Sequence, residues 1–361
     1  MSEIRVNNLS NESSTGGPTI SGITTFSGTN FFVPPVGNTA QRPENSEKGS
    51  LRFNTDTAHL EYFKGDTIGW VQVEAIEAAP LGARGIFAGG NSPTRLQTID
   101  YITVATTSNA LDFGDLSTVR DVPAGAANLV RGIVAGGYQS PAGDLSSVDQ
   151  VTIATLGNGT SWGSLSTARR NRDGCGDYSR GLFMSGYPTT AQIDYLTFMS
   201  TGTSIDFGDT TQSRYNPANV SDGTRAVCCG GNNPSTNICD YVTIQSTGNA
   251  KDFGDLVTAS TACSGHSSST RGIIGMNGTE VNYITIATTG NAADFGDVHN
   301  GNGPMATGSS TRCCIAGGYA PSQVNTIQYV TMTTLGNGND FGDLTGVRSQ
   351  GATFSNSGGG L

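Results

Sequence analysis

The stretch Arg131-Gly-Ile-Val-Ala-Gly-Gly137 is one of six versions of the same short pattern in this chain of 361 residues. Each version begins with an arginine, continues with small or apolar residues, and in most cases ends in a glycine pair. The versions are 47, 49, 45, 46 and 41 residues apart and start at Arg84, Arg131, Arg180, Arg225, Arg271 and Arg312. Repeats of this length, made of short strands and glycine-rich turns, are typical of four-stranded propeller blades.

Two further signatures follow each arginine pattern. The first is an alternating strand such as Asp100-Tyr-Ile-Thr-Val104, with counterparts centred on Gln150, Tyr195, Tyr241, Tyr283 and Tyr329. The second is Asp112-Phe-Gly-Asp115, which recurs around Phe207, Phe253, Phe295 and Phe341, and as the degenerate Ser161-Trp-Gly-Ser164. We expect the Phe to pack between blades, the Asp to accept backbone N–H bonds, and the repeated Arg to bond to these Asp residues or to carbonyls.

These signatures predict an all-β protein in which residues 79–361 form a six-bladed β-propeller. A right-handed solenoid would also repeat, but usually at a shorter period. Residues 74–81 do not match the first strand of the other repeats, whereas residues 348–356 do. We therefore expect a strand over 350–355 to complete the first blade, so that both ends of the chain close the ring and hide sheet edges.

The front of the chain differs from the repeats. Residues 1–45 are polar, contain Pro34, Pro35 and Pro43, and show no helical period, which predicts an extended arm. Residues 46–78 predict a small β-hairpin module with strands at 50–54, 60–63 and 70–73. A unit of this size is too small to hold a core alone, so we expect it to pack against another copy, the propeller or another protein.

Composition excludes several functions. Charged residues are only 13% of the chain and the net charge is −10, which argues against nucleic-acid binding and against binding to an anionic membrane. No run of 18 apolar residues exists, so no membrane insertion is expected, and the N-terminus lacks a secretory signal, which predicts synthesis in a cytoplasm. The odd count of seven cysteines predicts buried free thiols in strands.

The sequence suggests no catalytic residue, metal site or cofactor. His59, His266 and His299 occur in unrelated contexts, and the latter two are expected in or near connections between blades. The Asp-Phe-Gly-Asp segments have too few acidic residues for calcium loops. A carbohydrate-active enzyme would need at least two acids that converge on a central cleft.

Candidate binding residues lie in the loops between the second and third strands of the blades. These loops differ in length and sequence, whereas the turns between the third and fourth strands are nearly identical. Binding residues concentrate on variable loops that a rigid frame carries. The candidates are Asn91, Arg95, Tyr138, Gln139, Tyr187, Asn232, Asn233 and Tyr319.

Several motifs carry a resemblance to a known group of proteins. Arg5-Val-Asn-Asn8, Gly17-Pro-Thr-Ile-Ser-Gly22, Phe31-Phe-Val-Pro-Pro35 and Gly49-Ser-Leu-Arg-Phe-Asn-Thr55 resemble the N-terminal segment of structural proteins from marine tailed bacteriophages, especially cyanophages. The repeats resemble the divergent kelch-like repeats of such proteins. The second repeat departs by losing both Asp residues, and the fifth by losing its glycine pair.

The resemblance implies a non-enzymatic structural protein of the virion, such as a tail fibre or a head or tail appendage. Its partners would be other virion proteins, further copies of itself in an oligomer such as a trimer, and a glycan or protein of the host surface. The arm would attach to the virion through Ile4, Val6, Phe31, Phe32 and Val33. Alternatives are a decorating structural module without a ligand and a carbohydrate-active propeller enzyme.

Overall fold

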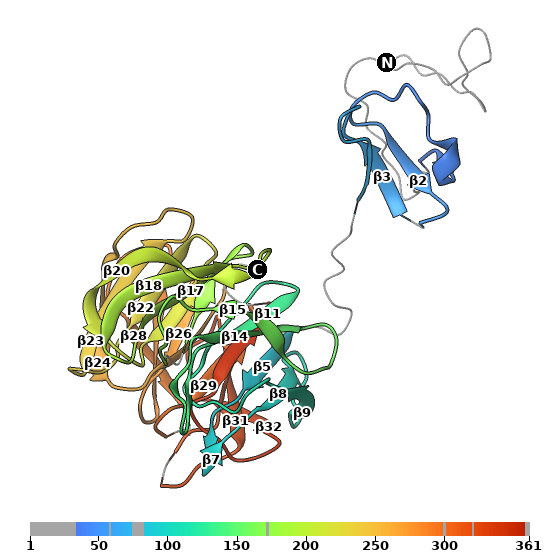
Figure 1. Cartoon of the computed structure of the whole chain (residues 1–361). Helices are drawn as coiled ribbons and strands as arrows, with labels where there is room; N and C mark the ends of the chain where they lie inside the picture. The colour runs from blue at the N-terminus through green and yellow to red at the C-terminus, as the bar shows by residue number, and fades with distance from the viewer. Residues whose placement is uncertain are drawn as a thin grey trace, which may run out of the picture. The chain divides into compact units, whose positions relative to one another are not determined.

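The protein is all-β, with strands making up 53% of the computed structural model. The structure describes residues 34–57, 59–73, 83–170, 173–298, 301–319 and 321–357, and these contain no α-helix. None of their helical segments is long and apolar enough to span a membrane. The chain divides into two compact units, Met1–Glu77 and Ala78–Leu361 (Figure 1).

The described part of the first unit is a single sheet in the order β1-β2-β3-β4. Its elements are β1 (Val36–Gly37), the 3-10 turn η1 (Thr39–Gln41), β2 (Leu51–Asn54), β3 (His59–Phe63) and β4 (Trp70–Gln72). The three strands expected over 50–73 are present. Val36 and Gly37, expected in an extended arm, instead pair in parallel with β2, because the backbone N–H groups of Phe53 and Thr55 donate to the carbonyls of Pro35 and Gly37.

Glu61 on β3 organises this small sheet. Its carboxylate is fully buried, receives an Arg42 Nη2 contact of 2.7 Å, and lies 3.5 Å from Arg52 Nη1. The Asn54 amide donates to the same carboxylate at 3.2 Å. The hydrogen bond from Arg42 is the largest of the effects that lower the pKa of Glu61. A buried carboxylate is stable only when paired and hydrogen-bonded in this way, so the ion pairs fix the register of β2 and β3.

We expect the first unit to lose stability in acid. Because the folded pKa of Glu61 lies below its unfolded value, its contribution is complete above the unfolded pKa and disappears as pH falls through the folded one. The fluorescence of Trp70 on β4, measured in a Trp162→Phe background, should report the transition. A Glu61→Gln variant should flatten this pH dependence. An unchanged profile in that variant would assign the transition to another group, with Asp56, whose pKa is also lowered, the first to test.

Six antiparallel sheets make up most of the described second unit, and we number them from sheet 1 to sheet 6. Each has four strands in the order first to fourth, and sheet 2 carries β19 (Gly202–Thr203) as an added parallel strand. Sheet 1 contains β33 (Ala352–Ser355), β5 (Arg84–Ala88), β8 (Thr98–Thr103) and β9 (Leu111–Asp115). Sheet 2 contains β10 (Ala124–Ala127), β11 (Arg131–Ala135), β14 (Ser147–Thr152) and β15 (Thr160–Ser164). Sheet 3 contains β16 (Cys175–Gly176), β17 (Arg180–Gly186), β18 (Thr190–Thr197) and β20 (Ile205–Arg214). Sheet 4 contains β21 (Ala218–Ser221), β22 (Arg225–Cys229), β23 (Thr236–Thr243) and β24 (Lys251–Ser260). Sheet 5 contains β25 (Ser264–Ser267), β26 (Arg271–Gly275), β27 (Glu280–Thr285) and β28 (Ala293–Asp297). Sheet 6 contains β29 (Met305–Gly308), β30 (Arg312–Ala316), β31 (Thr326–Thr331) and β32 (Asn339–Asp343).

Sheet 1 takes strands from both ends of the second unit. Its first strand, β33, pairs antiparallel with β5, so that Ala352 lies opposite Ala88. The Asn356 side chain then accepts a hydrogen bond from the backbone of Arg84 at 2.8 Å. In every other sheet the first strand directly precedes the second in the chain.

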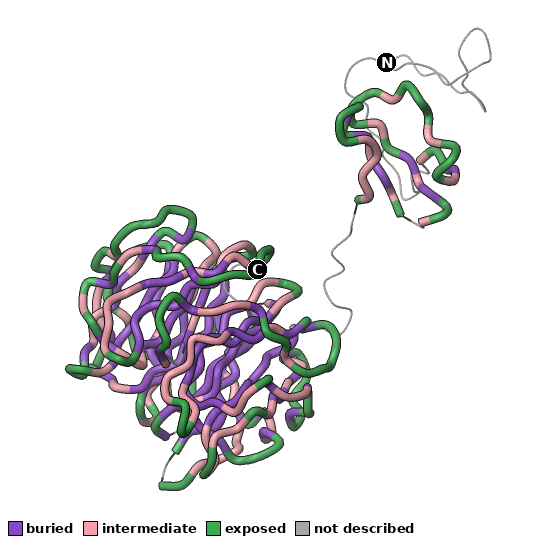
Figure 2. The backbone as a smooth tube through the Cα atoms, in the orientation of Figure 1, coloured by how far each residue is buried: buried purple, intermediate pink, exposed green. Residues whose placement is uncertain are grey.

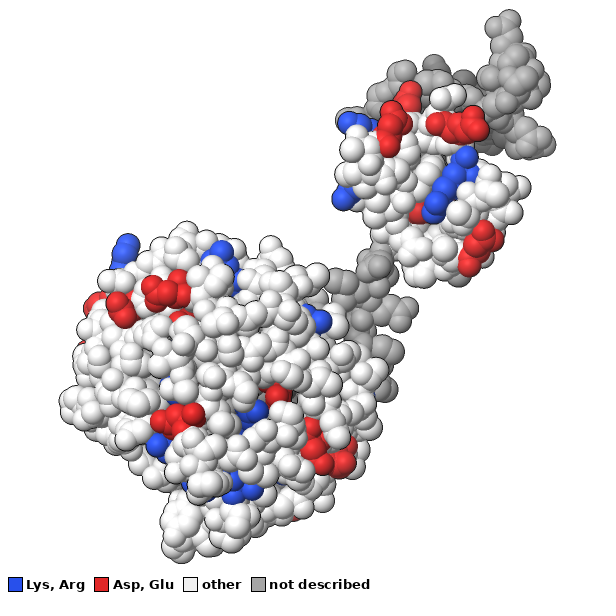
Figure 3. Space-filling model, in the orientation of Figure 1, with Lys and Arg blue, Asp and Glu red and all other residues white. Residues whose placement is uncertain are grey.

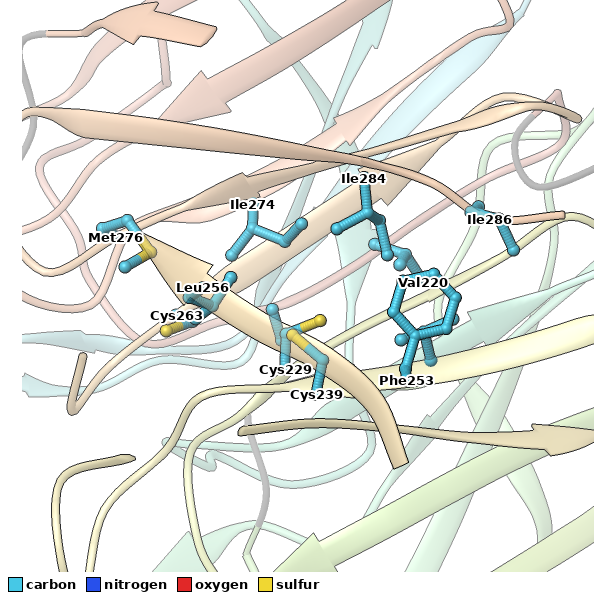
Figure 4. Close-up of a cluster of buried hydrophobic side chains, with 12 residues drawn as sticks. Val220, Cys229, Cys239, Phe253, Leu256, Cys263, Ile274, Met276, Ile284 and Ile286 are labelled. Carbon is cyan, nitrogen blue, oxygen red and sulfur yellow. The ribbon is translucent and has the colours of Figure 1, made fainter. Parts of the chain in front are cut away.

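The sheets pack face to face in sequence order. The first strand of each sheet lies beside that of the next, and β29 of sheet 6 lies beside β33 of sheet 1. Each buried apolar cluster combines side chains from two neighbouring sheets, and one joins sheet 6 to sheet 1. Figure 4 shows the cluster between sheets 4 and 5. Burial is accordingly concentrated in the strands, whereas the loops are exposed (Figure 2).

The Asp-Phe-Gly-Asp segments lie in the fourth strands and contact the following sheet. In the pair of sheets 4 and 5, Gly290 N donates to Phe253 O at 2.8 Å and Ala292 N to Asp255 O at 2.7 Å. The glycine between them, Gly254, has a φ of +143°, and a Cβ there would lie 2.5 Å from Gly290 O. Only glycine permits this close approach of the two backbones, which explains why the motif recurs.

The Phe of this motif packs as the sequence predicts, but the acids behave differently. Five Tyr–Phe pairs meet edge to face, with centroids 5.9–6.1 Å apart. The Asp side chains are mostly exposed, and among the described residues Asp294 alone accepts a backbone hydrogen bond within its own motif, from Gly296. The second Asp of the motif instead donates its backbone N–H to an Asn side chain of the next sheet, as Asp255 does to Asn291 at 3.1 Å.

The remaining expectations concern the cysteines and two of the histidines. All seven cysteines are buried and free, as predicted, and six of them lie in strands, whereas Cys263 directly precedes β25. His266, expected in or near a connection between blades, lies in β25, the first strand of sheet 5, close to the connection from sheet 4. The first strands consist mainly of small residues, and every residue of β25 except His266 fits that pattern. His299 lies outside the described residues.

Candidate binding surface on the loop face

The repeated arginines at the start of the second strands join neighbouring sheets into the frame that carries the loops at the opposite end of these strands. Each guanidinium lies over an aromatic ring of its own sheet; Arg271, for example, is 4.5 Å from the centre of Tyr283. Each also donates Nη1 to a backbone carbonyl of the next sheet, as Arg271 does to Met332 O at 2.8 Å. Arg312 of sheet 6 donates to Val104 O and Ala105 O of sheet 1. These arginines bind carbonyls and rings rather than the Asp-Phe-Gly-Asp acids.

Sheet 2 retains the same contact with different residues. Gln150 occupies the position of the tyrosine, and Arg131 lies instead over Trp162, 3.9 Å from the ring centre. Arg131 also donates to Phe198 O of sheet 3. The larger ring on the neighbouring strand therefore replaces the missing tyrosine, as a volume exchange between the two positions predicts.

A second set of arginines, which the sequence interpretation missed, lies at the end of a fourth strand or in the connection that follows it. Their guanidinium groups are fully buried, and each pairs with the Asp that precedes the third-strand Tyr or Gln of the next sheet. The pairs are Arg120–Asp149, Arg169–Asp194, Arg214–Asp240 and Arg348–Asp100. Where this position is Ser260, the last residue of β24, the residue in the partner position is Asn282 instead of Asp, so charge is lost from both positions together. That joint change is the signal that could have identified the pairs.

The loop face consists of the loops between second and third strands together with the connections that lead from sheet to sheet. The two meet in isolated backbone bridges, for example between Tyr138 and Asp121 and between Tyr187 and Arg170. Five of the predicted binding residues take part in such bridges: Asn91, Tyr138, Tyr187, Asn232 and Tyr319. Their backbones are therefore part of the frame, and only their side chains remain to bind a ligand.

Four side chains of neighbouring loops stack in a row, and a fifth continues it. Arg95 lies 4.4 Å and Arg170 4.5 Å from the ring centre of Tyr138, and Arg170 lies 4.4 Å from that of Tyr187. Tyr187 meets Tyr215 edge to face at 5.6 Å. We call Arg95, Tyr138, Arg170, Tyr187 and Tyr215 the Arg–Tyr surface. It runs from the loop of sheet 1 to the connection before sheet 4.

Two acids hold the arginines of this surface in place. Asp121 Oδ2 lies 3.3 Å from Arg95 Nε, and Asp144 Oδ1 lies 3.0 Å from Arg170 Nε. Asp144 is placed by the short ladder of β12 (Tyr138–Gln139) and β13 (Gly143–Asp144), in which it faces Tyr138. Partial burial raises the pKa of both acids. Charged side chains are otherwise sparse on the face of the second unit shown in Figure 3, where blue and red groups lie side by side.

The other predicted binding residues divide between this surface and its surroundings. The Asn232 amide donates to the Tyr215 hydroxyl at 2.8 Å and so extends the row. Gln139 follows Tyr138 in β12, and Asn233 donates to Thr189 Oγ1 at 2.9 Å. Asn91 and Tyr319 lie outside the row, and the Asn91 carbonyl accepts a bond from Gln323. Arg170 and Tyr215 were not predicted, because their role depends on which loops become neighbours.

No protein-family model and no curated protein matches the chain. The surface is therefore interpreted from its chemistry. Guanidinium groups fixed by ion pairs and by aromatic rings present hydrogen-bond donors at low cost in side-chain entropy. Tyrosine hydroxyls and the amides of Gln139, Asn232 and Asn233 add further polar groups around them.

A second candidate site is a cavity of about 60 Å³ among the first strands of all six sheets. Asp173 is the one acid among its described lining residues, and its carboxylate accepts backbone bonds from Gly174, Asn219 and Gly265. Burial raises the pKa of Asp173. His266 Nε2 lies 3.1 Å from Ser309 O, and burial lowers its pKa to about 4, so the ring is neutral at pH 7. These groups join neighbouring first strands.

No group of three or more His, Cys, Asp or Glu side chains that could hold a metal ion occurs among the residues that the structure describes. The residues expected to contact the virion, namely Ile4, Val6, Phe31, Phe32 and Val33, lie outside that part of the chain.

Proposed function

We propose that the second unit is a six-bladed β-propeller of the kelch-like kind, with β33 completing its first blade. The cyclic order of neighbouring first strands and the apolar cluster between sheets 6 and 1 support this. So do the bonds from Arg312 to sheet 1, which repeat those made between the other sheets. A cavity lined by all six first strands is expected along the axis of such a ring.

We further propose that the protein is a non-enzymatic component of a phage virion, in which this propeller binds a glycan or protein of the host surface. The virion setting rests on the resemblance of the N-terminal segment and the repeats to phage structural proteins. Residues 1–45 would attach the protein to the particle, and several copies would assemble together. Weak sites in many copies can then give strong attachment through avidity.

The Arg–Tyr surface is the proposed binding site, because its residues differ from those at the matching positions of the other sheets. The residues of the frame recur from sheet to sheet, as the carbonyl-binding arginines and the Tyr–Phe pairs do. At the bridge position of the connections, by contrast, the residues are Asp121, Arg170, Tyr215, Asn302 and Ser349. Folding requires only the backbone of these positions, so their side chains can serve recognition.

Cell binding by the full-length chain tests this function. Beads that carry many copies should retain intact bacterial cells, with marine cyanobacteria tested first. An Arg170→Ala/Tyr187→Ala variant should reduce the number of retained cells by about tenfold or more, because avidity multiplies the loss at each site. The control is Tyr178→Ala, which removes an exposed tyrosine at the opposite end of β17 from Tyr187.

Two results would contradict the proposal. If no cell type is retained, the protein has no host-binding role, and the structural alternative without a ligand takes its place. If Tyr178→Ala reduces retention as much as the double variant, binding occurs elsewhere than the Arg–Tyr surface.

A further inference from the structure

The two arginines of the Arg–Tyr surface share one aromatic ring, which limits the distance between them. Both guanidinium carbons lie over the ring of Tyr138, so they are at most 8.9 Å apart, the sum of their distances to its centre. Each is also held by an acid at its Nε atom. No hydrogen bond joins the Nη atoms of either arginine to another described residue, and both side chains are about 30% exposed.

We propose that Arg95 and Arg170 bind two neighbouring acidic groups of an anionic polysaccharide. This inference rests on the proposed function and specifies the chemistry of the ligand. The Nη atoms are the donors, and the ligand supplies carboxylate or sulfate oxygens, which accept paired hydrogen bonds from a planar guanidinium. Asp121 and Asp144 keep the guanidinium groups in position before the ligand arrives, which lowers the entropy cost of binding.

The arrangement of the rings favours an acidic polysaccharide over a neutral one. Neutral sugars are commonly bound by stacking on an open aromatic face, but the ring of Tyr138 is already covered by guanidinium groups. Tyr187 and the amide of Gln139 remain to bond sugar hydroxyls. A protein partner would need an exposed apolar centre, and Tyr187 is the one large apolar side chain exposed in this row.

Binding of defined polymers to the full-length chain tests the proposal. Dextran sulfate and polygalacturonate distinguish sulfate from carboxylate ligands, and unmodified dextran is the neutral counterpart of the first. We expect binding to at least one acidic polymer, no binding to dextran, and weaker binding as salt is raised. Equal binding to dextran and dextran sulfate would overturn the proposal, and so would the absence of binding to both acidic polymers.

Charge-matched variants separate this site from general electrostatic attraction. Replacing one ion pair as a unit, Arg170→Gln/Asp144→Asn, leaves the net charge unchanged and should weaken binding by about tenfold. Lys251→Gln removes an exposed charge elsewhere and should have little effect. If Lys251→Gln weakens binding as much as the paired variant, the attraction is not specific to Arg95 and Arg170.

The outcomes also distinguish this inference from the function on which it rests. Cells retained by the beads without any binding of acidic polymers would remove the inference and leave the host-binding role. Polymer binding without retention of cells would support the site and contradict the role.

Discussion

Replacing Arg348 with Ser should lower the free energy of unfolding by about 3–5 kcal/mol, the range measured when one member of a buried ion pair is removed. Arg348 Nη2 lies 2.9 Å from Asp100 Oδ2, and neither side chain is more than 2% exposed. Without Arg348, Asp100 keeps the backbone and hydroxyl bonds from Thr345 but has no cation to balance its charge. Guanidinium chloride unfolding, followed by circular dichroism, measures the loss.

The chain contains its own matched control for this experiment. Between sheets 4 and 5 the same two positions are Ser260 and Asn282, and the Asn282 side chain accepts a backbone bond from Val257. The double variant Arg348→Ser/Asp100→Asn copies that neutral arrangement and should recover most of the stability lost in Arg348→Ser. Equal losses in the single and double variants would show that the packing of Arg348, rather than the uncompensated charge of Asp100, sets the cost.

Removing residues 350–361 should prevent the second unit from folding at 25 °C. The deletion takes away all four pairs of β33 with β5 and the buried ring of Phe354, against which Gly132 packs. Loss of a buried Phe side chain alone costs about 3–5 kcal/mol, and whole domains are stable by only about 5–15 kcal/mol. The deletion also leaves β5 as an open edge, which favours aggregation. Circular dichroism and size-exclusion chromatography would measure both effects.

A transferred strand provides the control for the truncation. If the segment 350–357 is inserted before Arg84 in the shortened chain, sheet 1 acquires a first strand that precedes its second, as in the other five sheets. We expect this variant to regain a folded, monodisperse second unit. A truncated chain that folds without the insertion would show that β33 is not needed to complete sheet 1.

The sequence predicted the features that repeat. The all-β class, the buried cysteines and the packing of the motif Phe between neighbouring sheets follow from residues that occur at the same place in most repeats. The six-bladed ring is still a prediction. The buried arginines were missed because an arginine in a connection is usually solvated, and only the change to Ser260 together with Asn282 marks them as paired.

The Arg–Tyr surface could be predicted only in part. Arg95, Tyr138 and Tyr187 were identified because they occupy variable loops, whereas Arg170 is 32 residues from Tyr138 and meets it only when two sheets pack together. The strand at Val36 and Gly37 was missed for a similar reason. It has only two residues and no alternating pattern, and its pairing depends on β2.

The way the chain enters sheet 1 has a mechanical consequence. The segment that joins the two units reaches the second unit at β5, which is flanked on one side by β33 and on the other by β8. Tension applied through the first unit therefore acts on an interior strand, and pulling that strand out requires both ladders to break together. Force applied between the two units would therefore load two ladders of that sheet at once, instead of peeling one strand from its edge.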